Sequence, residues 1–309
     1  MADRRDPRPR PARRNRRPGA ARQSRAARTG ERNGGTTMSR PVDTADTYSR
    51  IQVMGWAARA GFADYRTVFT WKTWLLGWFV RMLAQVLFFT TIGHLLGPGQ
   101  ARYLLVGNAV ALVALHGLSA TASTTWELQN GTLPLLVASP SHPALVLVGR
   151  SLFWLPDGVA CGLGAVLLLG PLADVRLTVA SVTLFTLLLT LVAATSYCLG
   201  LFLGSLVLTA VDLRNVVSNA SFTVMLIVCG AAVPASALGP VLAGLGTVLP
   251  LTHGLLAIRE VLAGEAGLQT AALAGWEILI GACWLVAALL VLGWKARRSR
   301  RNGAALFLT

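Results

Sequence analysis

Residues 126 to 150 read WELQNGTLPLLVASPSHPALVLVGR, a polar segment that lies between two long apolar runs. One acid, Glu127, stands near its start. Three short pairs then divide it: Gly131-Thr132, Ser139-Pro140 and Gly149-Arg150. Gly and Pro are the strongest punctuators of local structure, and a simple connector does not need this much order. The apolar runs on either side are each near the roughly 20 residues of a membrane-spanning helix, so the segment indicates a structured link between two spans.

The composition of the whole chain agrees with a membrane protein. Hydrophobic residues make up 54% and charged residues 13% of the 309 positions, and the mean hydropathy is +0.57. A soluble domain carries about 25% charged residues. This difference excludes an ordinary soluble globular fold.

Six apolar runs predict an all-α integral membrane fold, because a helix satisfies its own backbone hydrogen bonds in lipid. We expect the spans at about Trp74–Leu96, Tyr103–Thr124, Ser151–Pro171, Thr178–Thr209, Asn215–Val233 and Ala274–Trp294. Ahead of them, residues 51–74 mix aromatic and aliphatic side chains with basic ones. That pattern is typical of a helix lying in the membrane interface.

The connection between the fifth and sixth spans is unlike a simple loop. Residues 233 to 267 read VPASALGPVLAGLGTVLPLTHGLLAIREVLAGEAG, an apolar stretch broken by three prolines. It is too short to cross the membrane and return as two full helices, so we expect a re-entrant helical hairpin on the outer side. Irregular backbone at that depth must pack in protein or line a cavity. The hairpin would therefore form an outer gate, with Pro234, Pro250, Thr252 and Arg259 as its gate residues.

Charge is concentrated at the two ends of the chain. Half of the 28 Lys and Arg residues are arginines within the first 50 positions, and Lys295, Arg297, Arg298, Arg300 and Arg301 cluster near the other end. Basic residues favour the cytoplasmic side, so both termini are expected there. Residues 1–47 predict a disordered Arg/Pro-rich arm, residues 48–301 the transmembrane domain, and residues 302–309 a short tail. A basic folded face for nucleic acid is not indicated.

The Arg-rich arm allows two other interpretations. Its Arg-Arg pairs invite a twin-arginine export signal, but no apolar region with a cleavage site follows within reach. Met38 is a plausible alternative start, which would remove most of the arm.

Two segments carry a family resemblance. The first contains Glu127-x3-Gly131-Thr132-Leu133, Ser139-Pro140 and Gly149-Arg150; the second contains Gly230-x3-Pro234, Leu249-Pro250-Leu251-Thr252, Arg259 and Gly264. Over residues 51 to 301 the chain resembles the type-2 ABC exporter permeases, which include drug-resistance, antibiotic-export and polysaccharide or teichoic-acid exporters. It departs from the family at Pro134, where an acid often follows Gly-Thr-Leu.

The resemblance implies partners and a division of labour. Two permeases, identical or paralogous, would stand above two ABC ATPase subunits that bind ATP and Mg²⁺. The interfacial helix and the 126–150 segment would contact the ATPase through Glu127, Gly131, Thr132, Ser139, Pro140 and Arg150. This chain contains no G-x-x-x-x-G-K-[ST] sequence for holding phosphates, so we expect it to have no ATPase site and no cofactor of its own.

Small and thiol side chains inside the spans have simple interpretations. Gly158, Gly162, Gly164 and Gly170 are expected at helix-packing positions. The four cysteines each stand alone in an apolar run, with no second Cys or His at metal spacing, so neither a disulfide nor a metal site is expected.

Three ionisable residues, Arg81, His116 and Asp157, fall inside the expected spans, each roughly 10 Å from the inner end at 1.5 Å per residue. Such groups are costly in lipid and are usually paired or face a cavity, which predicts a polar cluster at an inward-facing cavity. In the alternative, Arg81 reaches the headgroups and Asp157 lies near the start of a helix that begins later.

The sequence thus predicts the permease subunit of an ATP-driven exporter in the bacterial plasma membrane, moving an amphiphilic drug, antibiotic or lipid-linked substrate outward. Two alternatives stay open. A non-transporting immunity or sensor subunit would have the same sequence features. A membrane-embedded enzyme would need a catalytic constellation, and Ser196, Ser205, Asp157 and His116 form no known motif.

Overall fold

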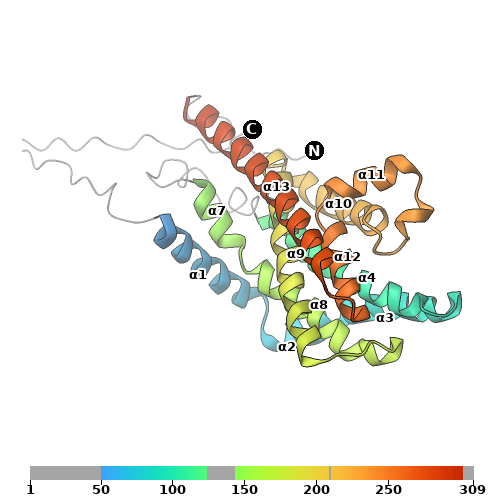
Figure 1. The fold of residues 1–309 in the computed structure, drawn as a ribbon. Helices are drawn as coiled ribbons and strands as arrows, with labels where there is room; N and C mark the ends of the chain where they lie inside the picture. Colours follow the sequence, from blue (N-terminus) through green and yellow to red (C-terminus); the bar gives the residue numbers. More distant parts are fainter. Residues whose placement is uncertain (1–49, 124–142, 209, 302–309) are drawn as a thin grey trace, which may run out of the picture. The chain divides into compact units, whose positions relative to one another are not determined.

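The structure is a computed structural model that describes residues 50–123, 143–208 and 210–301. These residues are helical with no strand among them (Figure 1), which confirms the expected all-α membrane fold. The expected arm, residues 1–47, and the tail, residues 302–309, lie outside the described residues, as does most of the 126–150 segment.

The first half of the chain supplies the helices around the candidate site. They are α1 (Arg50–Val68), α2 (Trp71–Thr73), the π-helical turn η2 (Trp74–Phe79), α3 (Val80–Leu96), α4 (Gln100–Leu118), α7 (Pro143–Ser151) and α8 (Trp154–Leu169). The second half contains the 3-10 turn η3 (Gly170–Ala173), α9 (Val179–Leu206), η4 (Val211–Leu213), α10 (Arg214–Val228), η5 (Ala235–Ala237), α11 (Pro240–Val248), α12 (Thr252–Ala263) and α13 (Leu268–Arg301).

Five helical segments are long and apolar enough to cross a membrane. They are Trp71–Leu96, Gln100–Ser123, Leu145–Ala173, Val179–Leu206 and Leu268–Arg298. Helices α11 and α12 pass the same test only together, and they are bent by 89° at the break between them. The chain therefore bends sharply between α11 and α12, where the prolines predicted a break.

The fifth expected span, Asn215–Val233, needs correction. The helix there is α10, which has 15 residues. At 1.5 Å per residue it is about 22 Å long, shorter than the roughly 30 Å hydrocarbon core. It ends early because Gly230, with a φ of 81°, takes a left-handed conformation two residues after Val228, and hydrophobicity alone did not predict this stop.

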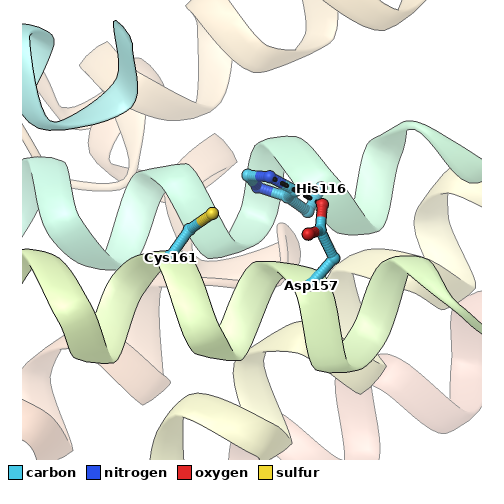
Figure 2. A group of neighbouring side chains, drawn as sticks. All are labelled: His116, Asp157 and Cys161. Carbon is cyan, nitrogen blue, oxygen red and sulfur yellow. Dashed lines mark ion pairs between the residues drawn. The ribbon is translucent and has the colours of Figure 1, made fainter. Parts of the chain in front are cut away.

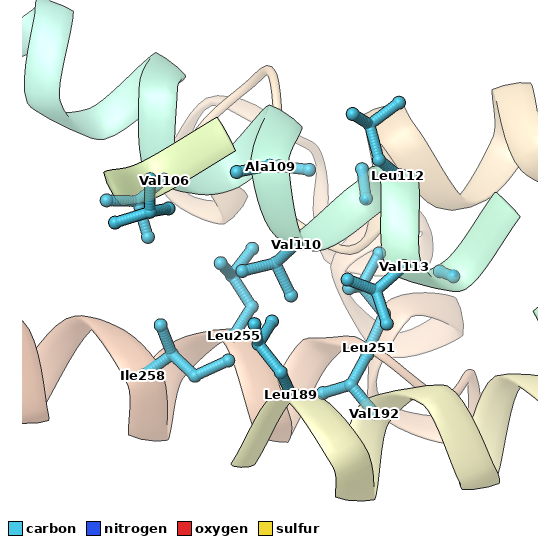
Figure 3. Packing of buried hydrophobic residues seen from close by; sticks show 14 of the residues in the cluster. Val106, Ala109, Val110, Leu112, Val113, Leu189, Val192, Leu251, Leu255 and Ile258 are labelled. Carbon is cyan, nitrogen blue, oxygen red and sulfur yellow. The ribbon is translucent and has the colours of Figure 1, made fainter. Parts of the chain in front are cut away.

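Helix α4 lies at the centre of the helical packing. In an apolar stretch of 18 residues within its span 89% of the residues are buried, compared with 22% in the corresponding stretches of the first and last spans. It contacts α3, α8, α9 and α10. In Figure 3 its valines and leucines pack against α9 and α12 through Leu189, Val192, Leu251, Leu255 and Ile258.

Glycines allow α8 to approach α4 closely. A Cβ on Gly158 would lie 2.8 Å from His116 Cβ, and one on Gly162 would lie 2.4 Å from Val113 Cγ2. The expected packing role of these two glycines is confirmed. The close approach brings the polar side chains of α8 against the last turn of α4.

Candidate functional site

Asp157 lies in the first turn of α8 and is 8% exposed. The segment Leu145–Ala173 forms one span with a short irregularity near its start, where α7 ends at Ser151 and α8 begins at Trp154. Asp157 Oδ1 accepts hydrogen bonds from Tyr65 Oη at 2.9 Å and from Trp74 Nε1 at 2.5 Å. One carboxylate oxygen thus joins α1, η2 and α8.

His116, in the last turn of α4, is fully buried. Its Nδ1 lies 2.7 Å from Leu112 O, a carbonyl that can only accept, so we assign the proton to Nδ1. Its Nε2 then accepts from Trp78 Nε1 at 3.0 Å. Tyr65, Trp74, Trp78, His116 and Asp157 together form the polar cluster.

The contact between His116 and Asp157 is chemically incomplete. Figure 2 shows the two side chains facing each other, with Nε2 and Oδ2 3.3 Å apart. Oδ2 is buried and receives no hydrogen bond from any residue that the structure describes. With His116 neutral, two acceptor atoms therefore face each other. A proton on Nε2 would turn the contact into an ion pair, and Trp78 would have to release that nitrogen.

Arg81 was expected in the same cluster, but the structure places it elsewhere. It is exposed, and its Cζ lies 5.9 Å from the centre of the Trp78 ring. Within the part of the chain that the structure describes, Arg81 and Asp157 do not form an ion pair with each other. A π-helical turn at residues 74–79 comes just before Arg81, and its wider spacing changes which residues share a face relative to a regular α-helix.

Cys161 stands next to this pair, one helical turn after Asp157 on α8 (Figure 2). Potential ligand atoms of His116, Asp157 and Cys161 lie within 4.8 Å of one another. Sequence spacing did not predict that Cys161 joins His116 and Asp157, because His116 belongs to a different helix from Cys161. The three residues do not fit a preformed metal site, because Trp78 Nε1 donates to His116 Nε2 and the other ring nitrogen bonds Leu112 O, which leaves no free imidazole lone pair for a cation.

A cavity of about 570 Å³ opens against Asp157. Its walls are mostly aromatic: Phe62, Tyr65, Phe69, Trp71, Trp74 and Phe153. Burial, and then the Asp157 carboxylate, raise the pKa of Tyr65 well above its usual value. Tyr65 therefore keeps its proton and stays a hydrogen-bond donor to Asp157.

Helix α1 lies beside α7 (Figure 1), and the two pack closely. A Cβ on Gly61 would lie 2.1 Å from Arg150 O, and one on Gly149 2.6 Å from Ala57 Cβ. Arg150 Nη2 pairs with Asp64 Oδ2 at 2.5 Å. Arg150 is thus in contact with α1. The other expected coupling residues, Glu127, Gly131, Thr132, Ser139 and Pro140, lie outside the described residues.

The expected gate residues are spread along the helix pair: Pro234 lies before α11, Pro250 and Thr252 at the corner, and Arg259 within α12. Arg259 Nη2 donates to Gly230 O at 2.9 Å, and its Cζ lies 3.7 Å from the centre of the Tyr103 ring. Thr252 Oγ1 donates to Gly246 O at 2.6 Å. Pro250 is buried and Pro234 is exposed. Arg259 thus ties α12 to the end of α10 and the start of α4.

Sequence reasoning missed Glu277, a fully buried acid on α13. Its Oε1 accepts from Leu251 N at 2.8 Å and Thr195 Oγ1 at 2.6 Å, and its Oε2 accepts from Gly254 N at 2.9 Å. Leu251 has a φ of 99°, rare for a residue with a side chain. Glu277 therefore holds the corner between α11 and α12 and caps the N-terminus of α12.

These features define a class: a multi-pass helical membrane protein with a buried polar cluster and a bent helix pair before its last span. A family model described as the ABC-2 type transporter matches residues 64–263. The chain belongs to the ABC-2 type transporter family and is a membrane subunit of an ABC transporter. The match runs from Asp64 in α1 to the last residue of α12. No curated protein matches the chain.

Proposed function

We propose that the chain is the permease subunit of an ATP-driven exporter that moves an amphiphilic drug, antibiotic or lipid-linked molecule out through the bacterial plasma membrane. ATP would be hydrolysed by separate ABC ATPase subunits. The family and the aromatic cavity support this proposal, and the lack of a phosphate-binding sequence in the chain agrees with it.

One observation carries the mechanism. Arg150, at the end of the 126–150 segment, pairs with Asp64 on α1, and the next residue, Tyr65, donates to Asp157 on α8. Asp157 faces His116 on the central helix α4. A displacement of the 126–150 segment by an ATPase would thus reach the helix core through four contiguous helices: α7, α1, α8 and α4.

The proposed topology places both termini in the cytoplasm, because both ends of the chain are basic. Two ends on one side require an even number of crossings. The five continuous spans therefore need one more crossing between residues 207 and 267, which α10 would supply, so that the α11–α12 pair lies on the outer side. The first and last spans are mostly exposed, which leaves surface for lipid and for a second permease.

The test is purification from native membranes followed by reconstitution. We expect an ABC ATPase to copurify, and the complex in vesicles to expel fluorescent amphiphiles only when ATP is present. A catalytically inactive ATPase variant is the control. Copurification without ATP-dependent efflux of any amphiphile would contradict export and favour the sensor or immunity alternative.

A further inference from the structure

We propose that the cavity next to Asp157 binds the ammonium group of an amphiphile. Binding itself does not require the exporter function, but identifying the bound molecule as cargo rests on the proposed function. The cavity of about 570 Å³ is within the size range of small-molecule sites, about 300–1,000 Å³.

The first reason is the chemistry of the walls. Six aromatic side chains line the cavity, and the ring of Tyr65 contacts two others, with centroids 5.0 Å apart for Tyr65–Phe69 and 4.8 Å apart for Tyr65–Phe153. Aromatic faces attract cations, and quaternary ammonium ligands are recognised in this way. The same rings pack against an alkyl or aromatic body, so the walls suit an amphiphile with a cationic end.

The second reason is the charge of Asp157 at the cavity. The donors that hold Oδ1, Tyr65 Oη and Trp74 Nε1, are neutral groups. Among the described residues no Arg or Lys forms an ion pair with Asp157, and the assigned tautomer of His116 is neutral. A carboxylate in a span is costly without a counter-charge. An ammonium group in the cavity would supply one.

A second cavity in the same chain serves as a comparison. It has about 610 Å³ and is also partly aromatic, with Trp276 and Trp284 in its wall. No Asp, Glu, Lys or Arg lines it. Two cavities of similar size therefore differ in that only the first has a buried carboxylate in its wall, so only the cavity next to Asp157 should distinguish a cation from a neutral molecule of the same shape.

Arg66 allows a test of whether the ligand is a lipid headgroup or a cationic cargo molecule. It also lines the cavity but is exposed, and its Cζ lies 6.0 Å from the centre of the Phe62 ring. A lipid headgroup such as phosphoethanolamine could place its ammonium at Asp157 and its phosphate at Arg66. A simple cationic cargo would use Asp157 and the rings alone.

The experiment measures binding to the purified chain in phosphatidylglycerol nanodiscs, without ATP or ATPase. The probe is a dansyl-labelled alkyl trimethylammonium, read by energy transfer from the protein's tryptophans, and its neutral tert-butyl isostere is the control ligand.

Asp157→Asn should weaken binding of the cation by at least about tenfold and leave binding of the isostere unchanged. Trp71→Ala, which removes an exposed wall and none of the hydrogen bonds to Asp157, should weaken it by about threefold. Trp276→Phe, in the second cavity, is the matched control and should have no effect.

The lipid source is tested by adding phosphatidylethanolamine to the nanodiscs. If a lipid headgroup is the natural ligand, this lipid displaces the probe from the wild type and does so less from Arg66→Ala. If a cationic cargo is the ligand, the lipid does not compete, and Arg66→Ala binds the probe equally or more tightly. Equal binding of probe and isostere, or wild-type affinity in both Asp157→Asn and Trp71→Ala, would overturn the proposal. Because no transport step is involved, failure of the exporter function would leave this result unaffected.

Discussion

At the residue scale, the positions of some ionisable groups inside the spans could be predicted from the sequence, and those of others could not. His116 and Asp157 were expected at one level, because each lies a similar distance along its span, and the structure brings them within 3.3 Å. Arg81 was expected with them, but the π-helical turn before it was not foreseeable from a 3.6-residue period. Glu277 was missed because it stands near the end of its expected span, where an acid is easily taken as solvent-exposed.

Double-mutant cycles on thermal stability in detergent should separate these residues. We expect His116→Ala and Asp157→Ala to be non-additive by about 0.5–3 kcal/mol, since the two side chains are in contact. The cycle of Arg81→Ala with Asp157→Ala is the matched comparison and should be additive. A coupling energy for Arg81–Asp157 as large as that for His116–Asp157 would contradict the described geometry or indicate a contact between two copies of the chain.

Glu277→Gln should destabilise the protein by about 1.5–3 kcal/mol, the usual effect of losing a hydrogen bond to a charged group. The carboxylate of Glu277 accepts three hydrogen bonds. In the glutamine variant the NH2 group can only donate, so it would face at least one of these donors without forming a hydrogen bond. The exposed Glu265, just after α12, provides the control Glu265→Gln. Equal melting temperatures for the two variants in detergent would show that Glu277 does not hold the corner.

At the scale of the elements, helix existence was predictable and helix ends were not. Long apolar runs identified the continuous spans, and the prolines identified the break in the hairpin. The stop of α10 at Val228 and the division between α7 and α8 depend on local backbone geometry and on tertiary contacts, which a hydrophobicity pattern does not contain. The closeness of α1 and α7 likewise depends on glycines that are distant in sequence.

Gly61 and Gly55 allow a matched test of the α1–α7 contact. A Cβ at position 61 would overlap Arg150 O, whereas a Cβ at position 55 has no heavy atom within 4 Å. Gly61→Ala should therefore cost about 1–3 kcal/mol from overpacking. Gly55→Ala should be neutral or stabilise by up to about 1 kcal/mol through helix propensity. Thermal unfolding in detergent gives both values, and equal effects would rule out close packing at Gly61.

At the scale of the whole molecule, the orientation in the membrane can be tested with single cysteines in a background without the native thiols. Ser236 and Gly244 lie in the hairpin region and are exposed, and Gly244 has open space around its Cα. An impermeant thiol reagent should label Ser236→Cys and Gly244→Cys from outside the cell, and Arg66→Cys only after the membrane is opened. The reverse pattern would invert the topology.

In the proposed mechanism, motion of the 126–150 segment reaches the buried polar cluster through the Arg150–Asp64 pair. The pair is partly exposed, with 29% of the Arg150 and 60% of the Asp64 side chain accessible, so it contributes little to stability, about 0–1 kcal/mol. Its loss should therefore affect coupling more than folding.

The most direct measurement is ATP-dependent efflux from vesicles for Arg150→Asp, Asp64→Arg and the double exchange. We expect each single variant to insert normally but to lose most of its efflux, and the double exchange to recover a substantial part. Wild-type efflux in both single variants, or a double exchange no better than either single one, would contradict the proposed mechanism.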